Sequence, residues 1–157
     1  MILPTGDRTF GLGTGELGYQ FNLPISHYGD VFDFHFNIGT TFTPRVSALL
    51  ENGFLSSAQD LRSFNLGASV YWKPKTNLHF FVEALALSNE EINDLGTRDR
   101  LTQVYLNPGV RYAICQLEEV EWVVGVSAPI GLTRDTPDIG LFIYMSIEFG
   151  FKKKNDE

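Results

Sequence analysis

The sequence is poor in cysteine, in basic residues and in long apolar runs, and each scarcity excludes a class of protein. Cys115 is the only cysteine among 157 residues, so no disulfide forms within the chain. Lysine and arginine total 12 against 19 aspartate and glutamate residues, and the formal net charge of −7 leaves no basic surface for nucleic acid. No run of about 18 apolar residues occurs, which excludes a transmembrane helix.

A helical period is missing as well, and apolar and polar residues alternate instead. In VFDFHFNIGTTF, residues 31–42, every second side chain from Phe32 to Ile38 is large and apolar. A period of two is typical of strands with one apolar face. Seven segments show it and are expected to be the strands of an all-β chain: residues 16–25, 31–42, 63–73, 77–87, 101–114, 120–130 and 139–151.

The expected strands are long, and their connections alternate in length. Most strands exceed the usual length of about 5 or 6 residues, and a tilted strand needs about 9 to 11 residues to cross a bilayer. Short connections alternate with longer ones: 26–29, 74–77 and 115–119 against 43–63, 88–101 and 131–139. Short turns at one end and long loops at the other are typical of an outer-membrane barrel. We therefore predict an antiparallel up-and-down transmembrane β-barrel segment over residues 1–151, followed by a charged C-terminal tail, 152–157.

The alternation also fits a soluble lipocalin-like barrel with an apolar ligand inside. Three features favour the membrane. Every lysine lies at the short-turn end or in the tail, whereas a soluble barrel needs charges along its outer face. The polar rows consist mainly of Asn, Gln, Ser, Thr and Gly, which suits a confined wet interior. The aromatic residues of the apolar rows are expected near the short-turn ends, as a girdle at the lipid interface: Phe21, Phe32, Phe34, Trp72, Phe80, Tyr112, Trp122, Phe149 and Phe151.

In this orientation the polar rows face a water-filled lumen. The predicted lumen-facing polar residues are Glu16, Gln20, Asn22, Asp33, His35, Asn37, Asn65, Glu83, Gln103, Asn107, Arg111, Glu121 and Glu148. We expect Arg111 to lie in a polar network with Glu83 and Glu121 that shapes the lumen. The alternative is that these charges only neutralise one another, since buried charges generally pair.

Gly13, Gly15 and Gly18 match the G-x-G-x-x-G pattern of dinucleotide-binding loops. That motif needs a helix after it, whereas an amphipathic strand follows here. A flexible loop is therefore predicted, and no cofactor.

The histidines indicate neither a metal site nor a catalytic site. His27 lies in a short turn, and His35 and His79 lie on strands that are not expected to be neighbours, so no metal ligand set is predicted. His79, Ser88 and Glu90 are the local candidates for a lipid hydrolase. Roughly 30 Å of strand separates the two ends of this set, whereas a nucleophile and its base must come within hydrogen-bond distance. The protein is not predicted to be an enzyme.

The loop NEEINDLGTRDR, residues 89–100, mixes acidic residues with arginines. Divalent ions and lipopolysaccharide headgroups are candidate ligands, and a solvated loop is the favoured interpretation because charge clusters usually stay in water.

The number of strands raises a question of closure. With seven strands, Phe151 ends on the short-turn side and Glu16 starts on the long-loop side, whereas bacterial barrels have an even strand number and both termini on the periplasmic side. We expect residues 1–4 to end a preceding strand and residues 5–15 to form its loop. Missing N-terminal strands or another chain are then needed to close the barrel, because unpaired strand edges are not tolerated in lipid.

A set of motifs in fixed order carries a family resemblance. LPTGDRTFGLGTGELGYQFNLPIS has P-x-G-D before a glycine-rich loop, FHFNIGTTFTP and SFNLGASVYWKP share N-x-G, and FFVEALA, LNPGVRYAI and VVGVSAPIGLTRDTPDIGLFIYMSIEF follow. The set resembles outer-membrane transporter barrels related to the meta-pathway phenol-degradation protein, over nearly the whole chain. The resemblance implies a barrel of about twelve strands, of which this chain supplies the C-terminal seven or so.

The sequence thus predicts a transporter- or porin-type barrel in the outer membrane of a Gram-negative bacterium. Its partners would be membrane lipid, lipopolysaccharide and small solutes, hydrophobic or aromatic compounds among them, which pass or bind passively through the polar lumen. Two alternatives stay open: a soluble lipocalin-like barrel that binds an apolar ligand, and a structural or enzymatic outer-membrane barrel.

Overall fold

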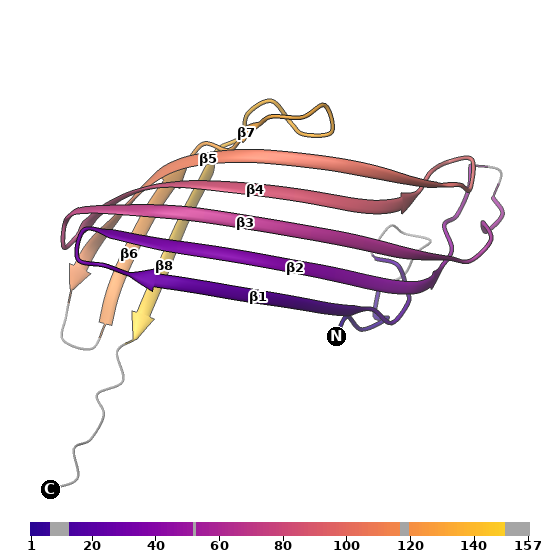
Figure 1. The fold of residues 1–157 in the computed structure, drawn as a ribbon, viewed down its shortest axis with the longest axis horizontal. Helices are drawn as coiled ribbons and strands as arrows, with labels where there is room; N and C mark the ends of the chain where they lie inside the picture. The colour runs from indigo at the N-terminus through magenta and orange to yellow at the C-terminus, as the bar shows by residue number, and fades with distance from the viewer. Residues whose placement is uncertain (7–12, 52, 117–119, 150–157) are drawn as a thin grey trace, which may run out of the picture.

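The computed structural model describes residues 1–6, 13–51, 53–116 and 120–149 (Figure 1). In these ranges the backbone forms eight strands: β1 (Tyr19–Tyr28), β2 (Phe32–Val46), β3 (Gln59–Lys75), β4 (Leu78–Ile92), β5 (Arg98–Gln116), β6 (Val120–Ser127), β7 (Ile130–Gly131) and β8 (Phe142–Phe149). Among the described residues, no helix has the length and apolarity that crossing a membrane requires.

The strands form one antiparallel up-and-down sheet in the order β1-β2-β3-β4-β5-β6-β8, with the short β7 paired to β5. The predicted all-β, up-and-down architecture is therefore confirmed. The described sheet is not closed, and β1 and β8 are its two edges. Figure 1 shows β1 to β5 running side by side while β6 and β8 are turned steeply against them, so the sheet is strongly curved.

The strand registers bring alternating residues of all strands onto two common faces. Phe36, Ala68 and Ala84 are paired across β2, β3 and β4 and lie on one face of the sheet. The adjacent row holds His35, Ser69 and Glu83, whose side chains lie on the opposite face. We call the two sides the apolar face and the polar face.

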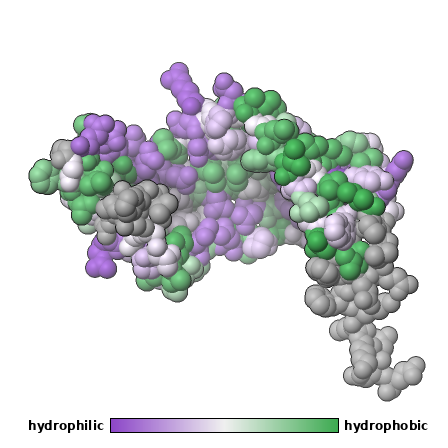
Figure 2. All heavy atoms as spheres, turned by 180° about the vertical axis from the view of Figure 1, so that it is seen from behind, coloured by the Kyte–Doolittle hydropathy of each residue, from purple (hydrophilic) through white to green (hydrophobic). Residues whose placement is uncertain are grey.

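The apolar face is the more exposed of the two. Phe21 is 71% exposed and Phe34 50%, whereas Asp33 and Ser127 on the polar face are 7% and 5% exposed. Figure 2, which views the molecule from behind, shows hydrophilic residues gathered in the hollowed middle. The sheet therefore curls around its polar side chains and presents its apolar side chains outward.

Strands β3, β4 and β5 run further toward the long-loop end than expected. Glu90 pairs with Arg100 and Ile92 with Arg98, so the connection predicted at 88–101 shrinks to a turn at residues 93–97. Gly96 has a φ of 76° in this turn, and its amide donates to the Asn93 carbonyl at 2.8 Å. The expected boundaries were too short because the backbone ladder continues after the alternation of apolar and polar residues has ended.

The segment expected as one strand over 120–130 is interrupted. β6 ends at Ser127 and β7 begins at Ile130, although both keep the same register along β5. Pro108 and Pro129 lie at the interruption, and neither has an N–H to donate. Each retains one ladder hydrogen bond as acceptor, from Ala128 at 3.0 Å and from Gly140 at 2.8 Å.

Near the start of the chain, Ile2 lies beside Gly18, the residue that immediately precedes β1. Ile2 and Gly18 form an antiparallel bridge, with N···O distances of 2.7 and 3.0 Å between their backbones. Residues 7–12, which were expected in the loop that follows, lie outside the described residues.

Candidate functional site

The polar face is the candidate site, because it carries most of the residues predicted to line a lumen. The residues that share it are Gln20, Asn22, Asp33, His35, Asn37, Asn65, Glu83, Gln103, Asn107 and Arg111. Glu16 precedes β1 and is not part of a strand. Glu121 and Glu148 are paired across β6 and β8, and their side chains lie outside the described part of the structure.

Glu83 is the centre of a hydrogen-bond network across β3, β4 and β5. Its carboxylate accepts from the Tyr71 hydroxyl and from the Asn107 amide nitrogen, each at 2.9 Å. A carboxylate is an acceptor only, so both contacts are charge-assisted hydrogen bonds. The other amide atom of Asn107, Oδ1, is buried and has no hydrogen-bond partner in the described structure.

Arg111 joins this network through Tyr71. Its Nε donates to Nδ1 of His79 at 2.9 Å, and its guanidinium lies 5.1 Å from the centre of the Tyr71 ring. Among the residues that the structure describes, Arg111 and Glu83 form no ion pair with each other. The expected association of Arg111 with Glu83 is therefore indirect.

A row of aromatic rings crosses the polar face next to the network. Tyr28, His35, Tyr71 and Phe81 follow one another on β1 to β4, with ring centroids 5.5, 5.4 and 5.1 Å apart. Tyr71 and Phe81 are not among the site residues predicted from the sequence. Their pairing could have been suspected because both lie on the polar rows of neighbouring predicted strands, and aromatic side chains on facing strands stabilise each other.

The short-turn end of the polar face is held by an ion pair. Lys73 Nζ lies 2.7 Å from Asp33 Oδ1 and also donates to the Gly29 carbonyl at 2.7 Å. The amide of Gly29 donates back to Asp33 at 3.2 Å. These contacts tie β2 and β3 to the turn that connects β1 with β2.

Three asparagines form a second polar cluster further along the face. Asn22 Oδ1 accepts from Nδ2 of Asn65 at 3.2 Å and from Nδ2 of Asn37 at 3.4 Å. Gly39 leaves the space for them, because a Cβ at this position would overlap the side chains of Asn22 and Asn65. The N-x-G motif of β2 thus places an amide and the space it needs on the same face.

Two hollows flank the Glu83–Asn107 pair. One, of about 390 Å³, is lined by Leu85, Tyr105 and Phe142 among others, and one of about 460 Å³ reaches Arg111 and Tyr144. The polar face therefore offers hydrogen-bonding groups beside space of small-molecule size.

The predicted aromatic girdle lies on the apolar face, with one correction. Phe32, Trp72 and Phe80 are paired at the short-turn end, and the last two rings stack with centroids 5.5 Å apart. Phe21 instead pairs with Thr40 in the long-loop half of the sheet, because β1 starts at Tyr19 beside that end of β2. The expected position of Phe21 near the short turns was wrong. The remaining girdle residues with described side chains are Phe34, Tyr112 and Trp122, whereas the side chain of Phe149 and all of Phe151 lie outside the description.

Aromatic residues also occur near the long-loop end of the apolar face, where none was predicted. Phe21 and Phe64 flank Thr40 in one row across the strands, and Tyr19 pairs with Phe42 in the next. The face thus has aromatic side chains toward both ends of its apolar stretch.

The structure does not bring the weaker candidates together. His79 lies on the polar face of β4 and contacts Arg111, whereas Ser88 and Glu90 lie on the apolar face at the other end and contact Arg100. In the part of the chain that is described, no group of three or more His, Cys, Asp or Glu side chains is arranged to hold a metal ion. Gly13 and Gly15 have φ values of 120° and 66° and lie before β1, which follows directly.

Comparison with protein-family models, with curated proteins and with solved structures found no match to this chain. The resemblance to the meta-pathway barrels stays an expectation from motifs alone.

Proposed function

We propose that this chain contributes to a transmembrane β-barrel of transporter type in the outer membrane of a Gram-negative bacterium. The observation that carries the proposal is the orientation of the two faces. In water, large apolar side chains are stabilised by removal from solvent. Here Phe21, Phe34 and Ile143 are 71%, 50% and 78% exposed, while the sheet curls around its polar residues. A hydrocarbon surrounding matches that arrangement.

The polar face supplies the lining of the proposed lumen. Glu83, Asn107, Arg111 and the asparagine cluster offer hydrogen-bond donors and acceptors along β1 to β5. A passive path needs no further chemistry, because width and lining polarity select the solute. Small solutes that carry hydrogen-bonding groups are the class that such a lining favours.

Closure of the barrel is part of the proposal. In hydrocarbon each unpaired backbone group costs several kcal/mol, so the free edges of β1 and β8 need partners. The Ile2–Gly18 bridge supports antiparallel pairing of a further strand along β1. Strands elsewhere in a longer chain, or a second chain, would complete the wall.

A second candidate function is favoured by one observation. The hollow of about 390 Å³ beside Leu85, Tyr105, Pro129 and Phe142 is largely apolar in its lining. This is the environment in which a lipocalin-like protein holds an apolar ligand. In that case the apolar face would need a protein cover instead of lipid.

The test compares the full chain in buffer, in detergent and in lipid vesicles. We expect it to be monodisperse only with detergent or lipid, and to release a trapped polar dye from vesicles faster than protein-free vesicles do. A protein that is monodisperse in buffer, leaves vesicles intact and binds an apolar fluorescent probe would contradict the proposal and support the second candidate.

A further inference from the structure

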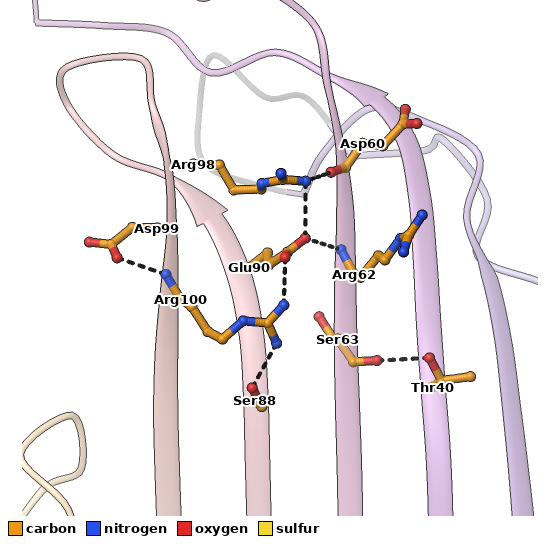
Figure 3. Close-up of polar contacts among 9 residues, drawn as sticks. All are labelled: Thr40, Asp60, Arg62, Ser63, Ser88, Glu90, Arg98, Asp99 and Arg100. Carbon is orange, nitrogen blue, oxygen red and sulfur yellow. Dashed lines mark hydrogen bonds and ion pairs between the residues drawn. The ribbon is translucent and has the colours of Figure 1, made fainter.

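Four charged residues lie close together where β3, β4 and β5 continue beyond their apolar residues (Figure 3). They are Arg62 on β3, Glu90 on β4, and Arg98 and Arg100 on β5, and we call them the arginine cluster. Glu90 is paired directly with Arg100 across β4 and β5.

The cluster lies on the apolar face. Arg62 is two residues before Phe64, Glu90 four residues after Ala86, and Arg100 four residues before Val104, so each shares the side of its strand with an apolar-face residue. The stretch of this face that precedes the cluster, residues 64–72, 80–86 and 104–112, is the apolar belt. The arginine cluster therefore borders the belt at its long-loop end.

One carboxylate organises the cluster. The Glu90 carboxylate bonds to Nη2 of Arg100, accepts from the Arg62 amide at 2.9 Å and lies 3.6 Å from Nη1 of Arg98. Its side chain is 11% exposed, compared with 50% for Arg98 and 43% for Arg100. Partial burial raises the pKa of the Glu90 carboxyl, but the Arg62 amide and the two guanidinium groups outweigh it and hold that pKa below its ordinary value.

Positive charge remains in excess on the apolar face at this end, because the Asp99 side chain belongs to the opposite face, where Asp99 pairs with Glu91. The Arg62 guanidinium lies 5.9 Å from the centre of the Phe42 ring, and no described carboxylate forms an ion pair with it. Asp60 is near, but its carboxylate accepts from the Arg45 amide, and Figure 3 shows it turned away from Arg98. Arg98 and Arg100 thus share one carboxylate, and the Arg62 guanidinium adds a third positive charge that no described carboxylate neutralises, in a chain whose formal net charge is −7.

We propose that the arginine cluster binds a phosphate group of a membrane lipid, at the level where headgroups meet hydrocarbon. This inference rests on the proposed function, because it needs the apolar belt to lie in a bilayer. Guanidinium groups bind phosphate through paired N–H donors. Arg62, Arg98 and Arg100 are all exposed on the apolar face: Arg98 and Arg100 gather at Glu90, and the Arg62 side chain is turned toward β2 (Figure 3).

The belt indicates why the phosphate belongs to a lipid. Phe64, which is 52% exposed, is the first belt residue after Arg62, and Phe42 lies under the Arg62 guanidinium. A ligand with a phosphate above and acyl chains below contacts both the cluster and these rings. Free phosphate contacts only the cluster.

The test measures lipid retention by the full chain in detergent micelles, with native mass spectrometry as the readout. The probes are lipid A with its phosphates, dephosphorylated lipid A and inorganic phosphate. We expect phosphorylated lipid A to bind, and the double variant R98Q/R100Q to lower its affinity about tenfold. The control Arg134→Gln removes one positive charge from the loop between β7 and β8, and is expected to leave the affinity within about twofold.

A second variant separates ligand binding from internal ion pairing. Glu90→Gln removes the carboxylate that competes with phosphate, so affinity for phosphorylated lipid A should rise about threefold. An affinity loss in Glu90→Gln equal to that in R98Q/R100Q would show that the cluster only pairs with itself, and would overturn the proposal. Equal affinity of the wild type for lipid A with and without phosphates would overturn it too, and tight binding of inorganic phosphate would overturn its lipid part.

Flotation with neutral phosphatidylcholine vesicles keeps the two proposals apart. If the wild-type chain does not float with the vesicles, the membrane function itself fails. If it floats and R98Q/R100Q binds lipid A as the wild type does, only the phosphate site fails.

Discussion

The apolar belt and the arginine cluster occupy the same face of the same three strands, yet their side chains are opposite in character. On β3 the apolar-face residues from 64 to 72 are all apolar, and the next residue of this face toward the long-loop end is Arg62. The backbone pairing continues without interruption across this boundary: Ser63 pairs with Asn89, and Glu90 pairs with Arg100. The ladder depends on backbone hydrogen bonds, which every residue can form, whereas the boundary between belt and cluster is a change in side-chain type alone.

Lengths support the same distinction. β3 has 17 residues and β5 has 19. At about 3.3 Å per residue, each strand is roughly twice as long as a hydrocarbon core is thick. The belt on β3 covers about 26 Å along the strand by the same rise. Under the proposed function, the outward side chains and not the strand length define which part of each strand lies in the bilayer.

The largest expected effect comes from a charge in the middle of the belt. Ala68→Arg puts a guanidinium on the exposed apolar face, and should lower the free energy of unfolding in lipid vesicles by about 2 to 4 kcal/mol. The control Ser69→Arg places the same charge one residue away on the polar face, beside Glu83, and should cost much less. Equal costs for the two variants would contradict a lipid-facing belt.

A smaller effect is expected on the polar face, where the charge of Glu83 accepts two hydrogen bonds. Glu83→Ala leaves the Tyr71 hydroxyl and the Asn107 amide without their acceptor, so the free energy of unfolding should fall by about 1 to 3 kcal/mol. Glu91→Ala, at an exposed position of the same face of β4, should change little. Denaturant unfolding in micelles measures both, and equal losses would show that the network adds no stability.

The smallest effect concerns the arginine cluster and pH. The pKa of Glu90 in the fold is lowered from its ordinary value near 4.5, so its ion pairs contribute fully above that pH and are lost as the pH falls through the folded value. For a pair at the rim this contribution is below about 1 kcal/mol. Unfolding measured from neutral pH down to about pH 3 should therefore lose slightly more stability in the wild type than in Glu90→Gln. The same pH dependence in both would contradict the role given to the carboxylate.

The fold class and the two faces could be predicted from the sequence because alternation is a local property. Phe34 and His35 need only their own strand to be assigned to opposite faces. Strand ends were harder: Glu90 and Arg100 are paired through backbone groups that every residue has, so no side-chain pattern marks the extension.

Contacts between strands could not be predicted because they depend on register. Tyr71 stacks on Phe81, and Arg111 donates a hydrogen bond to His79, because of the strand register. Shifting that register by one residue would abolish both contacts. The predicted position of Phe21 was wrong for the same reason, because the register that pairs Tyr19 with Phe42 determines where Phe21 lies along the sheet.

The two prolines at the β6–β7 junction, Pro108 on β5 and Pro129 between β6 and β7, have a consequence for how the sheet deforms. Pro108 and Pro129 each leave one ladder hydrogen bond unmade, on opposite sides of the same short stretch. Parting the strands there breaks fewer bonds than elsewhere, so the sheet has a compliant seam beside the hollow at Asn107 and Phe142. Amide hydrogens next to that seam should exchange with deuterium sooner than those in the middle of β3 and β4.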